Sequence, residues 1–424
     1  MRFLALLLLA AALAAAQPVR IAGHDAVYDS AGRLQPWAPW ADVIDREMEH
    51  YLKCPIENGY PRLVTTTFMD GNYQPVAKRP DSIPAMQLGT GIMSYLKYYA
   101  YKGKKDPRVL RFARYMGDYL VKENLTPDQG QYTRFPRSTG WRTKFPQPPD
   151  CGSQADKPYE VQPDKAAMAA YALVLLYDET KEQKYLDLAL HTARVLAKNM
   201  SDGDDEHSPW PFRVDYRTGQ GRGPVGANQS FPLRLFDILI DRGNPEFKAP
   251  RERLWTWIRD RQIPNANKSA VLWVQFFEDY EKLDNRNAWS PLNLARYLCE
   301  KKDALDPQWR EHALALITFV NRRFITVHHG VAVCGEQDYD KNPWGGVLAN
   351  YGGTLAVYSA ATGSPEFKFT AWQALTLGMY AVEQDGCPRE SFTSDRRGGW
   401  QEDSHTDRIH NLMDALNAFP EWGK

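Results

Sequence analysis

Three segments of the chain combine acidic residues with aromatic residues and glycine or arginine, which is the composition of a site for proton transfer on a sugar. In the first, residues 335–346, Glu336, Asp338 and Asp340 fall within five positions. Acids this close repel one another unless some of them meet cations, a metal or a proton. A crowded carboxyl group with a raised pKa suits a general acid near neutral pH. The alternative is that these acids only stabilise the N-terminus of the helix that follows.

The second segment, residues 276–289, places Asp279 close to Arg286 and Trp289. A carboxylate that shuttles protons beside a ring that stacks on a sugar face suits carbohydrate chemistry. The alternative is an aromatic corner that packs this loop onto the fold, with its acids solvated or paired with Arg286.

The third segment, GGWQEDSH at residues 398–405, leads into a predicted helix near the end of the chain. Its two glycines allow the backbone to approach a ligand closely, and Trp400 can serve as a stacking platform. Asp403 is the candidate acid of this segment. Helix capping by Ser404 or Thr406 is the alternative explanation for its polar residues.

Two further loops alternate cations with aromatic rings. Arg142 lies in residues 131–144, and Arg213 lies in residues 209–222. Arginine can bind a uronate carboxylate through two parallel hydrogen bonds, so these loops are candidate substrate contacts. The alternative is a solvated loop surface.

Neither a nucleotide nor a metal is predicted. Residues 221–226 (GRGPVG) match a dinucleotide-binding fingerprint letter by letter, but no predicted strand precedes them, and we reject that interpretation. His328, His329, His405 and His410 lack metal-ligand spacing together with a third partner. We therefore expect no cofactor and no metal.

The helices that must position these residues are indicated by a helix-start signal that recurs along the sequence. A capping residue directly precedes a proline at 106–107, 244–245, 306–307 and 364–365. Successive junctions, including a proline-free one at 180–185, are about 60 to 75 residues apart, the length of two helices with their loops.

The two helices of each repeat differ in character. Residues 166–177 (AAMAAYALVLLY) are apolar on every face, whereas residues 185–200 have a single apolar stripe, so the first predicts an inner helix and the second an outer helix. The predicted inner helices are 86–101, 166–177, 231–240, 292–298, 348–361 and 409–419. The predicted outer helices are 109–121, 185–200, 247–258, 309–319, 367–382 and 43–52.

Twelve helices in six pairs would bring the two ends of the chain together and close a ring. Connections within each pair are short, whereas those between pairs are long. If the inner helices run parallel, all the long loops gather at their N-termini, and long loops in a compact domain are usually functional. We therefore predict an all-α fold, an (α/α)6 toroid with long loops on one face.

The hairpin pattern resembles that of the six-hairpin glycosidase-like toroids. The resemblance rests on Ala166 and Ala169 through Tyr177 and Thr180, followed by Tyr185, and on its repeat in residues 358–367 (YSAATGSPEF). It implies a carbohydrate in a central cleft. Hydrolases, polysaccharide lyases and sugar epimerases all use this scaffold, so the fold alone does not select a reaction.

Composition and the N-terminal segment bear on partners and location. Lysine and arginine number 52, as do aspartate and glutamate, so no charge excess favours nucleic acid as a partner. Residues 1–16 have the layout of a signal peptide with cleavage before Gln17, and no later stretch is apolar enough for membrane insertion. We expect a single toroid domain over residues 17–424 that is periplasmic or secreted.

The leading hypothesis is an exported glycoside hydrolase with two carboxylates flanking the scissile bond. The candidate carboxylates are Glu336, Asp338, Asp279 and Asp403, and the candidate stacking rings are Trp289, Trp344 and Trp400. The second hypothesis is a polysaccharide lyase or uronate epimerase, with Tyr339 or His405 as the base and an Arg, Asn or acid that neutralises the substrate carboxylate. The candidate arginines are Arg142, Arg213 and Arg286. The third is a glycan-binding protein without turnover, whose acids would all be paired with cations.

Overall fold

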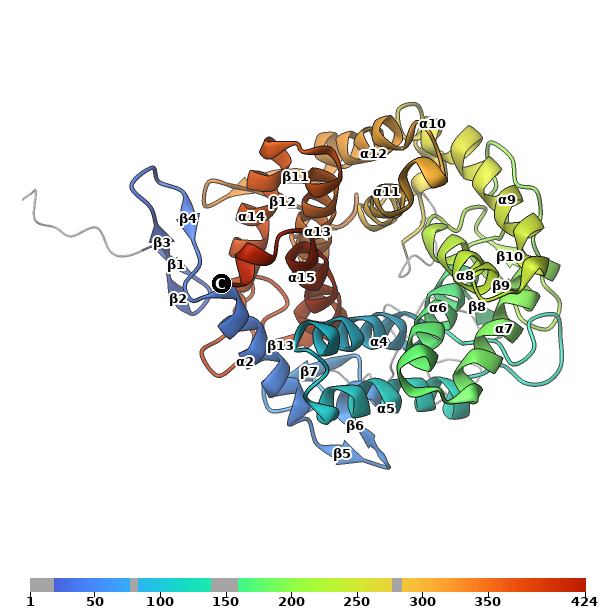
Figure 1. The fold of residues 1–424 in the computed structure, drawn as a ribbon, viewed down its shortest axis with the longest axis horizontal. Coiled ribbons are helices and arrows are strands. Elements are labelled where there is room, and N and C mark those ends of the chain that lie inside the picture. Colours follow the sequence, from blue (N-terminus) through green and yellow to red (C-terminus); the bar gives the residue numbers. More distant parts are fainter. Residues whose placement is uncertain (1–18, 77–82, 139–158, 277–283) are drawn as a thin grey trace, which may run out of the picture.

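The protein is described by a computed structural model over residues 19–76, 83–138, 159–276 and 284–424. Within these residues, pairs of helices follow one another around a ring (Figure 1). The inner helices are α4 (Pro84–Tyr101), α6 (Pro163–Thr180), α8 (Ser230–Ile240), α11 (Trp289–Lys301), α13 (Gly345–Thr362) and α15 (Asp407–Ala418). The outer helices are α5 (Pro107–Glu123), α7 (Gln183–Lys198), α9 (Lys248–Trp257), α12 (Trp309–Phe324), α14 (Pro365–Met379) and α2 (Trp40–Leu52). The predicted (α/α)6 toroid is confirmed.

Burial explains the two kinds of helix. Residues 163–170 at the start of α6 are all buried, because neighbouring inner helices and the outer layer surround them. In α5 the buried residues form one stripe that includes Val109, Phe112, Met116 and Leu120, and the opposite side is wet. A helix that is apolar on all sides needs protein on all sides, which places it at the inner ring.

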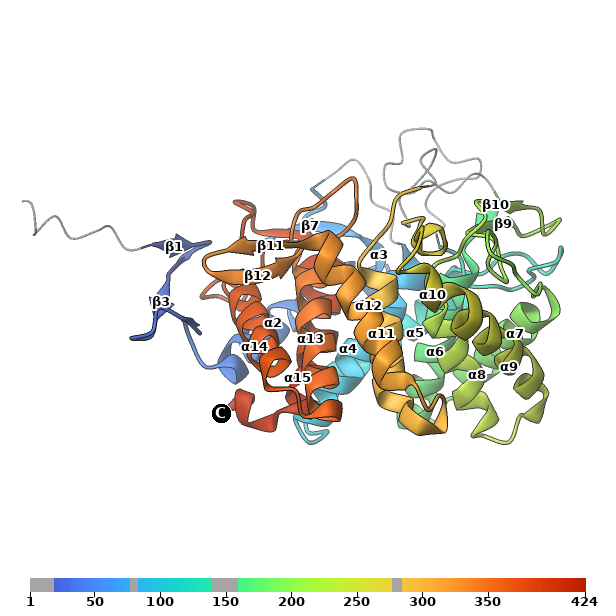
Figure 2. The same ribbon diagram turned by 90° about the horizontal axis from the view of Figure 1, so that it is seen from above.

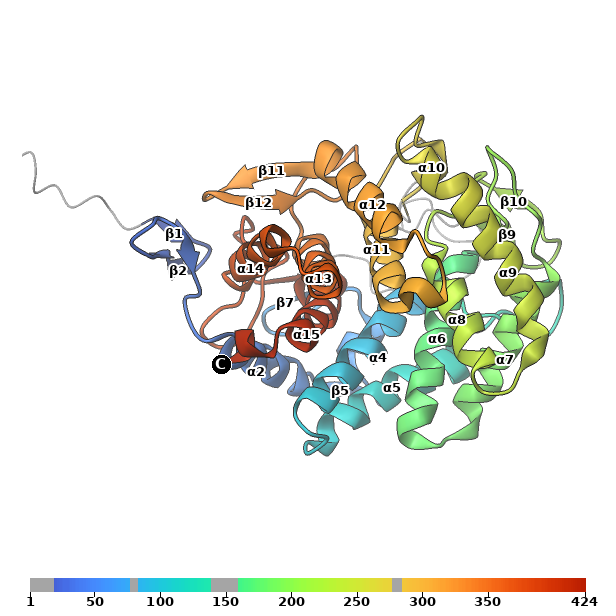
Figure 3. The ribbon, with the colours of Figure 1, turned by 45° about the horizontal axis from the view of Figure 1, so that its top comes forward.

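The ring closes between the two ends of the chain. The last inner helix, α15, packs against the first, α4, and α2 packs against both α5 and α14. A final 3₁₀ turn, Pro420–Gly423, contacts α2, and Figures 1 and 3 show the C-terminus beside that helix. Glu47 of α2 also pairs with Arg408 of α15 at 2.8 Å, so the predicted partnership of residues 43–52 with the C-terminal helix is observed.

The helices begin near the predicted capping residues, but fewer of those side chains form a capping hydrogen bond than predicted. The Asp106 carboxylate accepts a hydrogen bond from the Arg108 N–H at 2.9 Å and caps α5. Asn244 and Ser364 make no side-chain capping bond. Asp306 accepts from the Gln308 N–H at 3.0 Å, but α12 begins only at Trp309. Proline by itself fixes the first turn, because its φ already has the helical value.

Two wide π turns interrupt the expected helices. The helix predicted over 247–258 comprises a 3₁₀ turn (Pro245–Phe247), α9, a π turn (Ile258–Gln262) and the short α10 (Ile263–Asn265). Pro264 lacks an N–H and cannot continue the regular ladder, which accounts for the wide turn before it. A second π turn, Glu402–Thr406, leads directly into α15.

Short antiparallel strands are grouped mainly at one end of the helices (Figure 2). The pairs are β1 (Arg20–Ile21) with β2 (His24–Asp25), β3 (Val27–Tyr28) with β4 (Leu34–Gln35), β5 (Ile56–Glu57) with β6 (Tyr60–Pro61), β7 (Phe68–Asp70) with β13 (Gly398–Trp400), and β11 (Ile325–His328) with β12 (Val331–Cys334). A three-stranded sheet has the order β10 (Gly221–Arg222), β9 (Arg213–Asp215), β8 (Glu160–Val161).

The remaining elements are a short helix, α3 (Arg62–Thr65), and 3₁₀ turns at Val271–Trp273 and Lys302–Ala304. Within the described ranges, no helix combines the length and the apolar character needed to cross a membrane. The described cysteines are buried free thiols, and Cys151 lies outside the described residues.

Candidate active site

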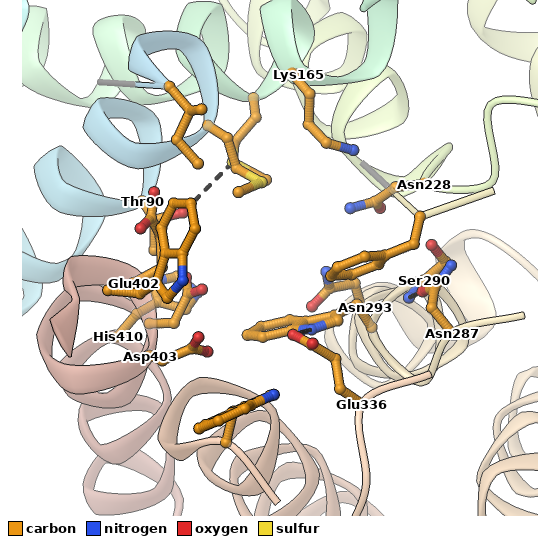
Figure 4. Close-up of a pocket in the computed structure, with 18 of the residues that line it drawn as sticks. Thr90, Lys165, Asn228, Asn287, Ser290, Asn293, Glu336, Glu402, Asp403 and His410 are labelled. Atoms are coloured by element: carbon orange, nitrogen blue, oxygen red, sulfur yellow. Dashed lines mark hydrogen bonds between the residues drawn. The ribbon is translucent and has the colours of Figure 1, made fainter. Parts of the chain in front are cut away.

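A cavity of about 270 Å³ opens at the N-terminal ends of the inner helices, where the long loops meet. Each inner helix, or the residues just before it, contributes to the lining. These contributions are Thr90 for α4, Lys165 for α6, Asn228 and Phe231 for α8, Trp289 and Asn293 for α11, Trp344 for α13, and Asp403 and Asp407 for α15. Figure 4 shows Glu336 and Asp403 pointing into this cavity and Lys165 reaching in from another side. The predicted gathering of the loops on one face is confirmed.

Glu336 is held in the cavity wall by the loop that follows β12. Its backbone carbonyl accepts the Ala288 N–H at 2.8 Å, which ties the loop to the start of α11. The indole N–H of Trp289 donates to Oε1 at 3.0 Å, and the amide of Gln337 donates to Oε2 at 3.2 Å. Donors on both oxygens favour the ionised carboxylate.

Asp403 lies in the π turn before α15, against the first turn of α13. A Cβ placed on Gly346 would lie 2.8 Å from its Oδ1, so the two segments are in close contact. Burial raises the pKa of Asp403 well above its ordinary value, and the negative charge of Glu336 adds to the shift. A raised pKa is the property that a carboxyl group needs to act as a general acid near neutral pH.

Two more acids stand beside this pair. Burial raises the pKa of Glu390, although its Oε1 accepts the Trp400 N–H at 3.1 Å. Burial also raises the pKa of Asp407 to about 7, against the opposing effects of a Thr90 hydrogen bond and the charge of Arg296. Both acids contribute to the negative potential felt by Asp403.

The described lining is strongly acidic. It contains seven carboxyl groups but only one lysine and no arginine: Asp164, Glu336, Asp340, Glu390, Glu402, Asp403 and Asp407 against Lys165. Lys165 is itself paired, since its Nζ donates to Asp164 Oδ2 at 2.7 Å. No group of three or more His, Cys, Asp or Glu side chains in the described part of the chain is arranged to hold a metal ion.

The three predicted stacking rings, Trp289, Trp344 and Trp400, all line the cavity. Trp344 is fixed by its indole N–H, which donates to Asp340 Oδ2 at 3.0 Å. Trp400 meets Phe68 edge to face, with ring centroids 5.9 Å apart. Fixed rings beside carboxyl groups form a surface on which a sugar can stack.

Three other predicted catalytic residues lie outside the cavity. Asp338 is held by Arg323 through two hydrogen bonds of 2.6 and 2.7 Å. Tyr339 is half exposed, and its hydroxyl donates to Asp284. His405 is fully buried between Glu47 and Tyr95, at 2.8 and 3.1 Å. Each of these side chains faces away because a closer partner satisfies it.

The predicted arginine contacts are also corrected. Arg213 is fully buried, with its guanidinium 4.2 Å from the Phe212 ring centroid, so it packs the interior. Arg286 contacts Asp338 at 3.4 Å and does not line the cavity. Arg142 and Asp279 lie outside the described residues.

The two glycines before Trp400 serve the fold itself. A Cβ on Gly398 would meet the Met69 carbonyl oxygen at 2.2 Å, and one on Gly399 would meet Glu390 Cγ at 2.0 Å. Their φ angles of +77° and +136° also exclude most side chains. The backbone of these glycines therefore lies close to β7 and to Glu390 of the same chain, rather than to a ligand as the sequence suggested.

Several lining residues escaped prediction from the sequence. Asp407 follows Asp403 by four positions, a spacing that places both on one helical face and could have signalled it. The charged pair Asp164–Lys165 at the start of a fully apolar helix was a second available signal. No sequence signal pointed to Glu390, because it reaches the cavity only through the course of a long loop.

Solved structures with the same architecture cover nearly the whole chain. A sugar epimerase from a ruminal bacterium is 14% identical with a TM-score of 0.66, over 89% of this chain and 97% of its own. The cellobiose 2-epimerase of Spirochaeta thermophila is 15% identical with a TM-score of 0.65, over 90% and 96%. A family 76 glycoside hydrolase from a bovine Bacteroides thetaiotaomicron strain is 10% identical with a TM-score of 0.61, over 91% and 78%.

No protein-family model and no curated protein sequence matches the chain. At these identities the similar structures establish the fold alone, an (α/α)6 toroid.

Proposed function

We propose that the protein is a glycoside hydrolase that acts on uncharged glycans, with Asp403 as general acid and Glu336 as general base or nucleophile. One observation carries the proposal. Two carboxyl groups point into the same tryptophan-lined cavity, and they differ in surroundings: burial raises the pKa of Asp403, whereas Glu336 accepts hydrogen bonds on both oxygens. Hydrolysis of a glycosidic bond needs one protonated and one ionised carboxyl group.

In the proposed reaction, Asp403 donates its proton to the glycosidic oxygen as the bond to the anomeric carbon breaks. Glu336, ionised and oriented by Trp289 and Gln337, either deprotonates the attacking water or bonds to the anomeric carbon itself. In the second case water then cleaves the intermediate and Asp403 recovers a proton. In the first case Glu336 ends protonated and Asp403 ionised, so Glu336 releases a proton to solvent and Asp403 takes one up before the next turnover. In both cases one water is consumed, and the carboxyl groups then stand as they began.

The charge of the cavity supports an uncharged substrate. A lyase or uronate epimerase must stabilise the charge that develops beside the substrate carboxylate, which a cation does most strongly and an amide or protonated acid does less strongly. The single lysine of the described lining is already bonded to Asp164, and six further carboxyl groups surround the space. A uronate would be repelled by the ionised members of this set, and its negative charge would raise the cost of ionising the others, whereas a neutral sugar avoids both effects.

Sugar epimerisation is the second candidate, because two of the similar structures are a sugar epimerase and a cellobiose 2-epimerase. It needs a group that removes a proton from carbon. His410 lines the cavity, but its Nε2 lies 3.3 Å from the Lys97 ammonium, which can only donate. The proton of the neutral ring is then on Nδ1, so His410 offers an N–H rather than a basic lone pair.

The test is a screen of neutral and uronate-containing oligosaccharides in D₂O, with products identified by mass spectrometry and NMR. We expect new reducing ends from a neutral substrate. Asp403→Asn and Glu336→Gln should each lower kcat/KM by about 100-fold or more, as loss of an acid or base typically does.

Asp338→Asn is the matched control, because it removes a carboxylate two residues from Glu336 but outside the cavity. Its activity should stay within a few fold of wild type. An epimer or ketose carrying solvent deuterium would indicate epimerisation, an unsaturated uronide would indicate a lyase, and saturable binding without product would indicate a glycan-binding protein. Any of these outcomes would contradict the hydrolase proposal.

On the sequence pattern of residues 1–16, we also propose that the protein is exported to the periplasm or medium. Recovery of the mature protein outside the cytoplasm, starting at Gln17, would support export, and retention of the full chain inside the cell would refute it.

A further inference from the structure

A second cavity, of about 440 Å³, lies at the opposite end of the ring, among the C-terminal halves of the inner helices. We call it the rear cavity. Its polar lining consists mainly of Lys97, Tyr171, Arg234, Arg296, Glu300 and Asp414. Met93, Phe231, Asn293 and His410 line both this cavity and the acidic one, so they form the layer between the two.

The rear cavity is basic where the first is acidic. Arg234 pairs with Glu300, which leaves no excess charge in that pair. Asp414 receives two cations, Lys97 at 2.5 Å and Arg296 at 2.8 Å. One carboxylate therefore faces two positive groups, and one positive charge in the cavity wall has no carboxylate of its own.

Two nitrogen atoms in the residues of this wall also have no hydrogen-bond partner among the described residues. Arg296 is 3% exposed, and its Nε has no hydrogen-bond acceptor among the described residues. The Nδ1 of His410 is likewise buried without a described partner. An unpaired buried donor costs about 1–3 kcal/mol. Both atoms are buried beneath the cavity surface, so they mark incomplete pairing around Asp414, and Lys97 is the cation that the cavity exposes.

Burial lowers the pKa of both Lys97 and Arg296, Asp414 opposes the shift in each, and repulsion from a neighbouring arginine adds to it. Part of the counter-charge to these cations comes from the carbonyl ends of the inner helices, which carry partial negative charge. Half a charge per helix end does not replace the hydrogen-bond acceptor that Arg296 Nε lacks.

We propose that the rear cavity binds a small oxyanion, a phosphate group, between Lys97 and Arg296 and beside His410. A phosphate oxygen is a strong acceptor for a guanidinium N–H and for an ammonium, and its charge neutralises the excess cation. The cavity is large enough for phosphate with its waters, or for the phosphate of a small ester. This site is separate from the acidic cavity and independent of the proposed hydrolase activity.

The test measures binding of inorganic phosphate to the full protein by isothermal titration calorimetry, with sodium chloride at equal ionic strength as the reference. We expect one saturable phosphate site. Lys97→Gln should weaken binding by at least tenfold. Lys102→Gln is the matched control, because Lys102 follows the same helix but pairs with Asp45 and does not line the cavity.

Asp414→Asn should have the opposite effect and tighten phosphate binding by about tenfold, because it removes the internal anion that competes for the two cations. This variant keeps the test decisive if Lys97→Gln does not fold. Asp403→Asn should leave phosphate binding unchanged, which separates this site from the acidic cavity. A parallel titration with a sugar phosphate distinguishes free phosphate from a phosphate ester.

Two results would overturn the proposal. One is the absence of binding beyond that of chloride, which would mean that the cations only balance the helix ends and Asp414. The other is phosphate binding that neither Lys97→Gln nor Asp414→Asn alters, which would place the anion elsewhere.

Discussion

Asp403 and Asp407 stand one helical turn apart on the cavity side of the last inner helix. Burial raises the pKa of both, and the charge of Asp407 raises that of Asp403 further. Asp407 therefore acts on Asp403 through its charge and is a positioning residue in the proposed reaction. A protein that keeps two such groups buried loses stability whenever they ionise.

Asp407→Asn should make folding stability less dependent on pH. The pKa of Asp407 rises from 3.8 unfolded to about 7 folded, so its effect on stability is absent below pH 4 and grows as pH rises through that window. Three pKa units correspond to about 4 kcal/mol of lost stability above pH 7. The variant should therefore gain up to that amount over wild type at pH 8 and little at pH 4.

Urea unfolding at pH 4, 6 and 8 measures this difference. Asp338→Asn is again the control, because that carboxylate is held by Arg323 outside the cavity. If the difference between wild type and Asp407→Asn does not grow from pH 4 to pH 8, the raised pKa of Asp407 is wrong.

At the scale of elements, β13 and the π turn after it carry the site. β13 pairs with β7, and this pairing fixes the position of Trp400, the last residue of β13. Asp403 lies three residues later, in the π turn. The extra residue of a π turn rotates the chain relative to a regular helix, which changes the side chains that face the cavity. This short segment therefore places both Trp400 and the proposed general acid Asp403 in the cavity.

Gly399→Ala should damage this segment. A Cβ there would lie 2.0 Å from Glu390 Cγ, at a φ of +136° that alanine rarely adopts. We expect a loss of about 2–3 kcal/mol in the free energy of unfolding, with a lower kcat because Glu390 and Trp400 must shift.

Gly363→Ala is the matched control for Gly399→Ala. Gly363 ends α13 with a φ of +80°, and a Cβ there meets no other atom within 4 Å. It should cost only the backbone strain of about 1 kcal/mol and leave activity unchanged. Equal losses at the two glycines would show that the contact with Glu390 does not matter.

At the scale of the whole molecule, a buried ion network closes the ring. Glu47 of α2 accepts from His405 Nδ1 at 2.8 Å and pairs with Arg408 at 2.8 Å. The His405 ring stacks on Tyr51 with centroids 3.7 Å apart. These contacts join the first outer helix to the last inner helix across the whole length of the sequence.

Glu47→Ala should lower the free energy of unfolding by about 3–5 kcal/mol, because it leaves Arg408 buried without its carboxylate. Glu49→Ala on the same helix removes only the exposed pair with Arg108 and should cost less than about 1 kcal/mol. Urea unfolding of both variants tests this contrast, and a Glu47→Ala cost as small as that of Glu49→Ala would contradict it.

The helices, their inner or outer place and the closed ring follow from the sequence, because apolar periodicity and proline at helix starts are local properties. The acids Glu336 and Asp403 and the tryptophans Trp289, Trp344 and Trp400 were predicted from a different local property, the grouping of acidic and aromatic residues in the long loops, and all five line the cavity.

Tertiary structure alone decided which neighbours of those residues face the cavity. Asp338 and Glu336 are two positions apart, yet Arg323 draws one outward while Trp289 holds the other inward. Glu390 and the rear cavity depend on contacts between helices far apart in sequence. Side-chain direction in a loop is set by such distant partners, and no local pattern encodes them.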